Sequence, residues 1–370
     1  MRRLLSAAVA LSFFLACPAP LESEDGGVGG GGGRTGGGTG GSGGGGGATT
    51  GGVRWSIDVT SPDIVDAMAV EPAGDLIVAV ETQSSGGPAV KTSIQRRAQA
   101  DGKVIWKYDL PGKRVAALDV SQDGRVAAAV SDGASDFTFV VLNADGSVRR
   151  TVTAPQAGFE APHFDSSGRI WLSIYTLDDT GTFAPSRLGS DAAWFAFGAF
   201  DADDFLVATG MTNTSTSLRG LELTGATRWE RPLSFQALDP DDSTLFTPRI
   251  GGGARTYVQF TSGARDGGFP AVDFGCGGGA RRALAALSPD GGCLWAKAIS
   301  GQSFFPLDRA FSPSANGVVY WDTTQVVEAN AEDGLPREVF DGGGPLVVAS
   351  PGSSAIYVYE ASGLSIRRVR

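Results

Sequence analysis

The feature that most constrains the fold is a β-hairpin that recurs along most of the chain. Its plainest copy is an apolar run at 67–70, a tight turn at 72–75 and a second apolar run at 76–80. Short apolar runs separated by Gly, Pro, Asn or Asp are typical of antiparallel strands. Further copies occur at 115–130, 162–175, 195–207, 235–246, 310–321 and 347–359. We therefore expect an all-β protein.

A second hairpin lies between these copies and often ends in tryptophan. In its plainest form an Asp-Gly turn at 101–102 leads to Trp106, and the segments 223–229 and 289–295 have the same order. Asp-Gly favours a type I′ turn because both central residues adopt positive φ. Variants without the aromatic residue occur at 143–148 and 331–339. Two hairpins per unit predict a four-stranded antiparallel sheet.

The spacing of the units predicts a β-propeller. Most copies of the first hairpin are about 34 to 47 residues apart, which suits one blade, and blades bury their faces by packing around a common axis. The interval between 235 and 310 is longer and contains a Gly-rich stretch at 251–279. We interpret it as one blade with an insertion, which gives seven blades, whereas two blades there would give eight.

The two ends of the propeller are expected to pair. The C-terminal strands at 355–359 and 364–369 lack an outer strand that carries tryptophan, and the run 53–59 around Trp55 supplies one. This pairing would complete the last blade and remove an exposed sheet edge. The propeller is thus predicted to span residues 53–370.

The N-terminus predicts export. Arg2 and Arg3 precede an apolar run at 4–15 that is too short for a stop-transfer helix, so we expect a signal peptide at residues 1–16. The run 14–17, Phe-Leu-Ala-Cys, resembles a bacterial lipobox, which implies that Cys17 is lipidated and becomes the mature N-terminus. Pro18 stands where an Asp would retain such a protein in the inner membrane, which favours the outer membrane, on its periplasmic face or at the cell surface. The alternative is an ordinary cleaved signal with an incidental cysteine.

A glycine tether follows the proposed anchor. Residues 26–52 are mostly glycine with scattered Thr and Ser and show no apolar periodicity. Such a segment cannot bury enough surface to offset its ordering entropy, so residues 17–52 are predicted to form a flexible linker. Its root-mean-square reach is roughly 30 Å.

The two other cysteines, Cys276 and Cys293, form a candidate disulfide. Export places them in an oxidising compartment, and Cys17 is used by the lipid. Closing a loop of about 17 residues would stabilise the fold by roughly 3 kcal/mol. The alternative is two free, buried thiols.

Three segments resemble known repeats. The run 272–277, Val-Asp-Phe-Gly-Cys-Gly, followed by 283–295 resembles the repeat of bacterial SBBP-type β-propeller proteins, which are exported scaffolds mostly without an assigned activity. The segment 221–229 resembles quinoprotein-like repeats. That group includes enzymes that bind a quinone and a metal ion, and also the propeller lipoprotein of the outer-membrane protein assembly machinery. The segment 288–295 fits the Asp box of sialidases, a structural turn without chemistry.

Residues suited to catalysis are scarce. His163 is the only histidine and begins an apolar strand, so we expect a structural role for it. The aspartates at 201–204 and 239–242 resemble the start of calcium loops, but they lack the Gly and Glu that such loops need, and we interpret them as turns. The net charge of −10 without a basic run argues against nucleic acid. No catalytic, cofactor-binding or metal-binding residue is predicted.

The sequence therefore predicts a monomeric lipoprotein of the cell envelope that contacts the membrane through its lipid alone. Its propeller would bind or scaffold an envelope protein or glycan and use no cofactor. The alternative is a propeller enzyme, either a quinone-dependent oxidoreductase or a glycoside hydrolase or lyase, because fold alone does not determine function.

Overall fold

A computed structural model of the chain describes the following residues: 49–51, 53–59, 63–82, 91–131, 137–153, 161–172, 175–185, 194–195, 205–211, 216–222, 224, 226–233, 243–251, 255–263, 275–276, 282–299, 311–322, 325–341, 346–350, 352–360 and 365–370. Contacts divide the chain into two units, Met1–Gly45 and Gly46–Arg370, and all described residues lie in the second. The regular elements among them are β-strands. None of these residues forms a helix long and apolar enough to cross a membrane.

The strands of the described residues form seven sheets, which we number in chain order. Sheet 1 contains β3 (Asp63–Val70), β4 (Leu76–Thr82), β5 (Lys91–Arg97) and β6 (Val104–Pro111). Sheet 2 contains β7 (Arg114–Val120), β8 (Val126–Ser131), β9 (Phe137–Leu142) and β10 (Val148–Thr153). Sheet 3 contains β11 (His163–Phe164), β12 (Ile170–Leu172), β13 (Tyr175–Leu177) and β14 (Phe183–Pro185). Sheet 4 contains β15 (Trp194–Phe195), β16 (Phe205–Met211), β17 (Thr216–Glu222) and β18 (Thr227–Leu233).

The last three sheets include the two ends of the described chain. Sheet 5 contains β19 (Ser243–Ile250), β20 (Thr256–Gly263), β21 (Arg282–Leu287) and β22 (Cys293–Ala298). Sheet 6 contains β23 (Phe311–Ser314), β24 (Gly317–Asp322), β25 (Gln325–Asn330) and β26 (Pro336–Asp341), with β1 (Thr49–Gly51) beside β26. Sheet 7 contains β27 (Leu346–Ala349), β28 (Ile356–Glu360) and β29 (Ser365–Arg368), with β2 (Trp55–Asp58) as its outer strand.

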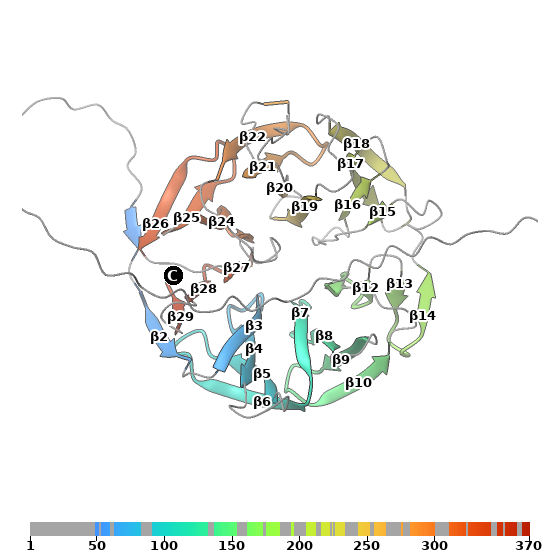
Figure 1. Ribbon diagram of the computed structural model, residues 1–370, viewed down its shortest axis with the longest axis vertical. Coiled ribbons are helices and arrows are strands. Elements are labelled where there is room, and N and C mark those ends of the chain that lie inside the picture. Colours follow the sequence, from blue (N-terminus) through green and yellow to red (C-terminus); the bar gives the residue numbers. More distant parts are fainter. Residues whose placement is uncertain are drawn as a thin grey trace, which may run out of the picture. The chain divides into compact units, whose positions relative to one another are not determined.

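Five pairs of neighbouring sheets contact one another through their first strands, and β16 of sheet 4 contacts β19 of sheet 5. Strand β3 contacts β7 and β27, β27 contacts β23, β23 contacts β19, and β7 contacts β11 (Figure 1). The buried side chains lie between the sheets. For example, Ile77 and Ile94 of sheet 1 pack against Val126 and Val140 of sheet 2. Sheets whose two faces are both covered by neighbours in this way form a β-propeller, as the repeat spacing predicts.

Pairing of the chain ends closes the last sheet, which confirms the sequence prediction. Strand β2 runs antiparallel to β29, with Trp55 opposite Arg368. Further bonds tie this sheet to sheet 1: Tyr357 Oη donates to the carbonyl of Gly74 at 2.6 Å, and Arg368 Nη1 donates to that of Gln99 at 2.7 Å. The N-terminal strand therefore covers an edge that the C-terminal hairpin would otherwise leave open.

Three local features differ from the expectations. The first hairpin of sheet 5 lies later than the one expected at 235–246, because 243–250 forms β19 and pairs with β20; residues 235–242 lie outside the described residues. A second hairpin in sheet 3, β13 and β14, was not predicted. Strand β1 lies within the stretch expected to be a flexible tether, and it pairs in parallel with β26. Within the long interval after residue 235, the described residues form the single sheet 5, although the total blade number stays a prediction.

Glu71 lies at the contact between sheets 1 and 2, and its ionisation is expected to make the stability of the protein depend on pH. We call such a contact between neighbouring sheets a seam. Its buried carboxylate contacts Arg96 Nη2 at 2.8 Å, and Arg96 Nη1 donates to the Ala144 carbonyl of sheet 2 at 3.1 Å. Burial raises the pKa of Glu71 to about 7, although Arg96 opposes this shift. The folded state therefore holds this proton more tightly than the unfolded chain, and stability is lost as pH rises from about 4.5 to about 7.

We expect Glu71→Gln to remove this loss. The free energy of unfolding of the variant, relative to that of the wild type, should rise by about 3 kcal/mol between pH 4.5 and pH 7.5. Urea titrations at a series of pH values measure this difference. A difference that stays constant with pH, or that falls as pH rises, would show that Glu71 ionises normally in the folded protein.

Candidate functional site

A repeated tryptophan joins each of several sheets to the next one. Trp106 follows a bulge in β6, its ring lies against Gly146 in the second turn of sheet 2, and its Nε1 donates to the Ala144 carbonyl at 2.9 Å. Trp295 makes the same contacts with Gly334 and with the Ala331 carbonyl, at 3.1 Å. The glycine has positive φ, and a Cβ on Gly146 would lie 2.7 Å from the indole. Only glycine therefore fits this turn without displacing the ring.

The same arrangement recurs at two further seams. Trp55 in β2 donates to the Gln99 carbonyl at 2.9 Å and lies against Gly102, and Trp229 in β18 lies against Gly291. The outer-strand tryptophan noted in the sequence is thus a connection between neighbouring sheets.

Arginine takes the place of this tryptophan at the seam between sheets 2 and 3. Arg150 pairs with Val141 directly after a bulge in β10, just as Trp106 pairs with Arg96 after the bulge in β6. Its Nη1 donates to the Asp178 carbonyl in the second turn of sheet 3. Arg150 therefore still contacts the next sheet, but it does so with a flexible, positively charged side chain in place of the indole ring found at the four tryptophan seams.

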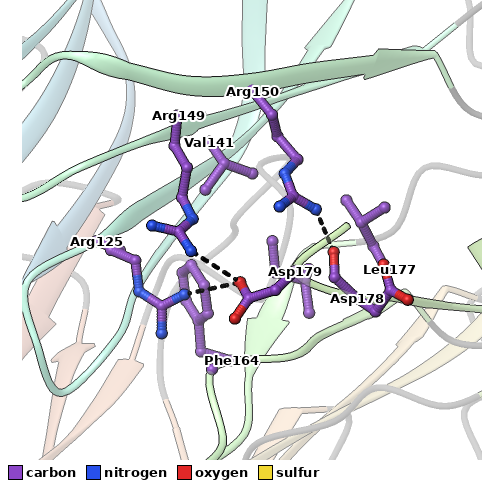
Figure 2. A pocket seen from close by; sticks show the side chains of 10 residues that line it. Arg125, Val141, Arg149, Arg150, Phe164, Leu177, Asp178 and Asp179 are labelled. Carbon is purple, nitrogen blue, oxygen red and sulfur yellow. Dashed lines mark hydrogen bonds and ion pairs between the residues drawn. The ribbon is translucent and has the colours of Figure 1, made fainter. Parts of the chain in front are cut away.

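Two further arginines converge on the same place. Arg125 comes from the first turn of sheet 2 and Arg149 from β10, and both contact Asp179 of sheet 3, at 3.3 and 3.4 Å (Figure 2). Arg125 also pairs with Asp123 at 2.9 Å, and its guanidinium lies 5.5 Å from the centre of the Phe164 ring. These side chains and Arg150 line a small depression, which we call the arginine pocket.

The floor of the arginine pocket is apolar and its rim is charged. Val141, Phe164, Ile170 and Leu177 line it together with the three arginines and with Asp178 and Asp179. The Asp178 carboxylate is used by its own turn, because it accepts the backbone N–H groups of Thr180 and Thr182 at 2.8 and 2.9 Å. These bonds, with the Thr180 hydroxyl as the largest cause, hold the pKa of Asp178 below its usual range. With Asp123, which pairs with Arg125, the three arginines are faced by three aspartates.

The innermost strands carry a second set of polar residues, which links neighbouring sheets. Asp119 in β7 accepts the backbone N–H of Phe164 in β11 at 2.8 Å, and Ser312 in β23 accepts that of Ala349 in β27 at 3.1 Å. His163 occupies the position of Asp119 in sheet 3, and Arg249 occupies it in sheet 5.

Burial changes the ionisation of two members of this set. It raises the pKa of Asp119 to about 6 and lowers that of His163 to about 3, with Arg249 adding to the second shift. His163 is thus neutral at physiological pH. Asp119 and Ser312 connect backbone segments, so we interpret the set as part of the fold.

The other residues singled out from the sequence divide into three groups. Cys276 and Cys293 form the expected disulfide, with Cα atoms 5.9 Å apart. Asp290 is a turn residue that accepts the backbone N–H of Gly292 at 3.3 Å. Cys17 and the aspartates at 201–204 and 239–242 lie outside the described residues. Within the described part of the chain, no three His, Cys, Asp or Glu side chains are placed to hold a metal ion.

The arginine pocket was missed from the sequence, although a signal for it exists. The hairpin at 143–148 stands out as a variant without tryptophan, and Arg149-Arg150 follows directly. Asking which residue replaces the tryptophan would have identified Arg150. The contribution of Arg125 needs the folded structure, because it comes from the other hairpin.

Comparison with known proteins supports the fold. None of the protein-family models matches the sequence, and neither does any curated protein. Among solved structures, hydrazine synthase of Kuenenia stuttgartiensis is similar with a TM-score of 0.53 at 10% identity, over 83% of this chain and 95% of that one. The fold is a β-propeller. The Cps50 (Swd1) propeller of Myceliophteria thermophila (TM-score 0.48, 12% identity, 84% and 99% covered) and the WD40 domain of Sif2 (0.48, 10%, 85% and 98%) are also similar. The likeness to SBBP-type repeats stays a resemblance.

Proposed function

We propose that this chain is a lipid-anchored protein of the cell envelope, with a propeller that binds a partner and catalyses no reaction. The observation that carries the proposal is the arginine pocket. At this seam, between sheets 2 and 3, Arg150 replaces the tryptophan of the other seams, and arginine side chains lie at the surface. Departures from a repeated local rule are expected at functional sites. Arg149 and Asp179 at its rim have side chains that are 38% and 58% exposed, so a partner can reach them.

The chain before the propeller supports the envelope location. The predicted signal at 1–16, Cys17 in a lipobox-like run and the glycine tether are together typical of an exported lipoprotein. The tether leads into β1 on sheet 6 and then into β2 on sheet 7, whereas the arginine pocket lies between sheets 2 and 3. The attachment to the membrane and the proposed binding site therefore use different parts of the ring.

Lipidation of Cys17 is the first test of this proposal. The mature protein should partition into detergent and take up labelled fatty acid during expression, because an acyl chain adds about 0.8 kcal/mol of membrane affinity per buried CH₂. Cys17→Ser should remain in the aqueous phase and stay unlabelled. If both forms partition equally into the aqueous phase, the protein has no lipid anchor.

A further inference from the structure

The tight turn between β23 and β24 contains the one Asn-Gly pair of the chain, Asn316-Gly317. The other asparagines are followed by alanine or threonine. Asn-Gly is the most labile asparagine sequence, because glycine has no Cβ to hinder the attack of its backbone nitrogen on the asparagine side chain. Ser314 and Gly317 are directly paired, so the turn itself consists of two residues, Ala315 and Asn316.

The packing of sheet 6 requires the glycine of this pair. A Cβ on Gly317 would lie 2.0 Å from the carbonyl oxygen of Ala329 and 2.8 Å from the backbone nitrogen of Ala331. Both contacts are with backbone atoms, which cannot move aside as the end of a side chain can. Any other residue would push β24 away from β25, so Asn316 keeps the least hindered neighbour that an asparagine can have.

The Asn316 side chain is held weakly and close to water. Its Nδ2 donates to Glu328 Oε1 over 3.4 Å, which is long for an N–H···O bond. Asn316 is half-buried, and Ala315 beside it is exposed. The side chain can therefore rotate until its carbonyl carbon faces the nitrogen of Gly317, and solvent reaches the turn.

We propose that Asn316 is a site of spontaneous deamidation, and that its conversion to an acid weakens the seam between sheets 6 and 7. The backbone nitrogen of Gly317 loses its proton and attacks Cγ of Asn316. A C–N bond forms, the bond from Cγ to the side-chain nitrogen breaks, and ammonia leaves a succinimide ring. Water then opens the ring to aspartate or isoaspartate, so one amide and one water give one carboxylic acid and one ammonia. The reaction needs neither the lipid anchor nor a binding partner.

The charges around the turn disfavour the product. Glu328 has a fully buried side chain, and Arg370 is its cation. Arg370 also contacts Glu338, so one guanidinium group already faces two carboxylates. Aspartate at position 316 would replace a donated hydrogen bond by a further negative charge beside Glu328, and like charges in a buried site repel each other strongly. Isoaspartate would add one carbon to the backbone of a two-residue turn. Both products should destabilise the sheets that Arg370 joins.

Peptide mapping of the full-length chain tests the reaction. The folded protein is kept in detergent at mildly alkaline pH, where the backbone nitrogen loses its proton more readily, and is then digested with trypsin. Cleavage after Arg309 and Arg337 gives one peptide that contains both Asn316 and Asn330. Fragment masses should place the change from amide to acid at Asn316, whereas Asn330, which precedes alanine, keeps its amide.

A sample unfolded in urea shows that the assay detects the conversion. The inference is wrong if Asn316 keeps its amide in the folded chain, or if Asn316 and Asn330 are converted equally.

The variant Asn316→Asp supplies one product directly. Its urea midpoint should be lower than that of the wild type, and the loss should shrink in the Glu328→Gln background, because the side chain beside it is then neutral. Asn143→Asp is the matched control, since Asn143 lies in the second turn of sheet 2, where sheet 3 has Asp178 at the equivalent position. This control should unfold like the wild type. Equal midpoints for Asn316→Asp and Asn143→Asp would contradict the inference, as would failure of Asn316→Asp to fold in both backgrounds.

Discussion

Replacement of Arg370 by methionine is expected to destabilise the propeller by about 3–5 kcal/mol, because it leaves a buried carboxylate without a cation. Glu328 in β25 has a fully buried side chain, and Arg370 Nη2 donates to its Oε1 at 2.6 Å. Arg370 Nη1 also reaches Glu338 Oε2 at 3.0 Å. Although burial opposes ionisation, the bonds from Arg370 and Ser314 hold the pKa of Glu328 below its usual range. Sheet 6 thus depends on Arg370, which follows the last strand of sheet 7.

Urea unfolding measures this loss as a shift of the midpoint at constant slope. Arg367→Met is the matched control, since Arg367 lies on β29 and pairs with the less buried Glu360. Its cost should be about 1 kcal/mol or less. The double variant Arg370→Met/Glu328→Gln should recover part of the stability, because the uncompensated charge is gone. Equal costs for Arg370→Met and Arg367→Met would contradict this account of the seam between sheets 6 and 7.

Removal of the disulfide is expected to cost roughly 3 kcal/mol. Cys276 lies in the insertion between β20 and β21, and Cys293 is the first residue of β22, so the bond fixes the insertion to sheet 5. The loop between them spans 17 residues, and closing a loop of this size restricts the unfolded chain. Guanidinium unfolding of Cys276→Ser/Cys293→Ser should show this decrease.

Reduction of the wild type supplies the control. With excess dithiothreitol, the wild type and the double variant should unfold at the same denaturant concentration, because neither then has the bond. If unreduced, unfolded mature protein contains two titratable thiols, the bond does not form.

The sheets could be predicted because their signals are local. Apolar runs and Asp-Gly turns specify each hairpin within about 20 residues. Strand β2 was identified because the last blade lacked an outer strand that carries tryptophan. The hairpin expected at 235–246 was placed too early, because the Asp and Pro residues at 239–242 have the composition of a turn, whereas 243–250 forms β19 and pairs with β20. The short strand β1 carries no apolar signal, since it consists of Thr49, Thr50 and Gly51.

The arginine pocket could not be read from composition or motifs. Its residues come from two hairpins of sheet 2 and one of sheet 3, and the meaning of Arg150 depends on a bulge that aligns it with the tryptophans of other sheets. The ion pair of Arg370 with Glu328 is equally long-range, spanning 42 residues. The sequence shows that the hairpin at 143–148 lacks the tryptophan. The role of Arg150 becomes clear only once the contact that tryptophan makes with the next sheet is known.

Arg150→Trp tests the central claim most directly, because it restores at the seam between sheets 2 and 3 the residue used at four other seams. Gly181 has a φ of 87° and lies across from Arg150 as Gly146 lies across from Trp106, so the indole has a turn to pack against. We predict that this variant unfolds at a denaturant concentration equal to or higher than that of the wild type. A variant that unfolds at a clearly lower concentration, or that does not fold, would contradict the account.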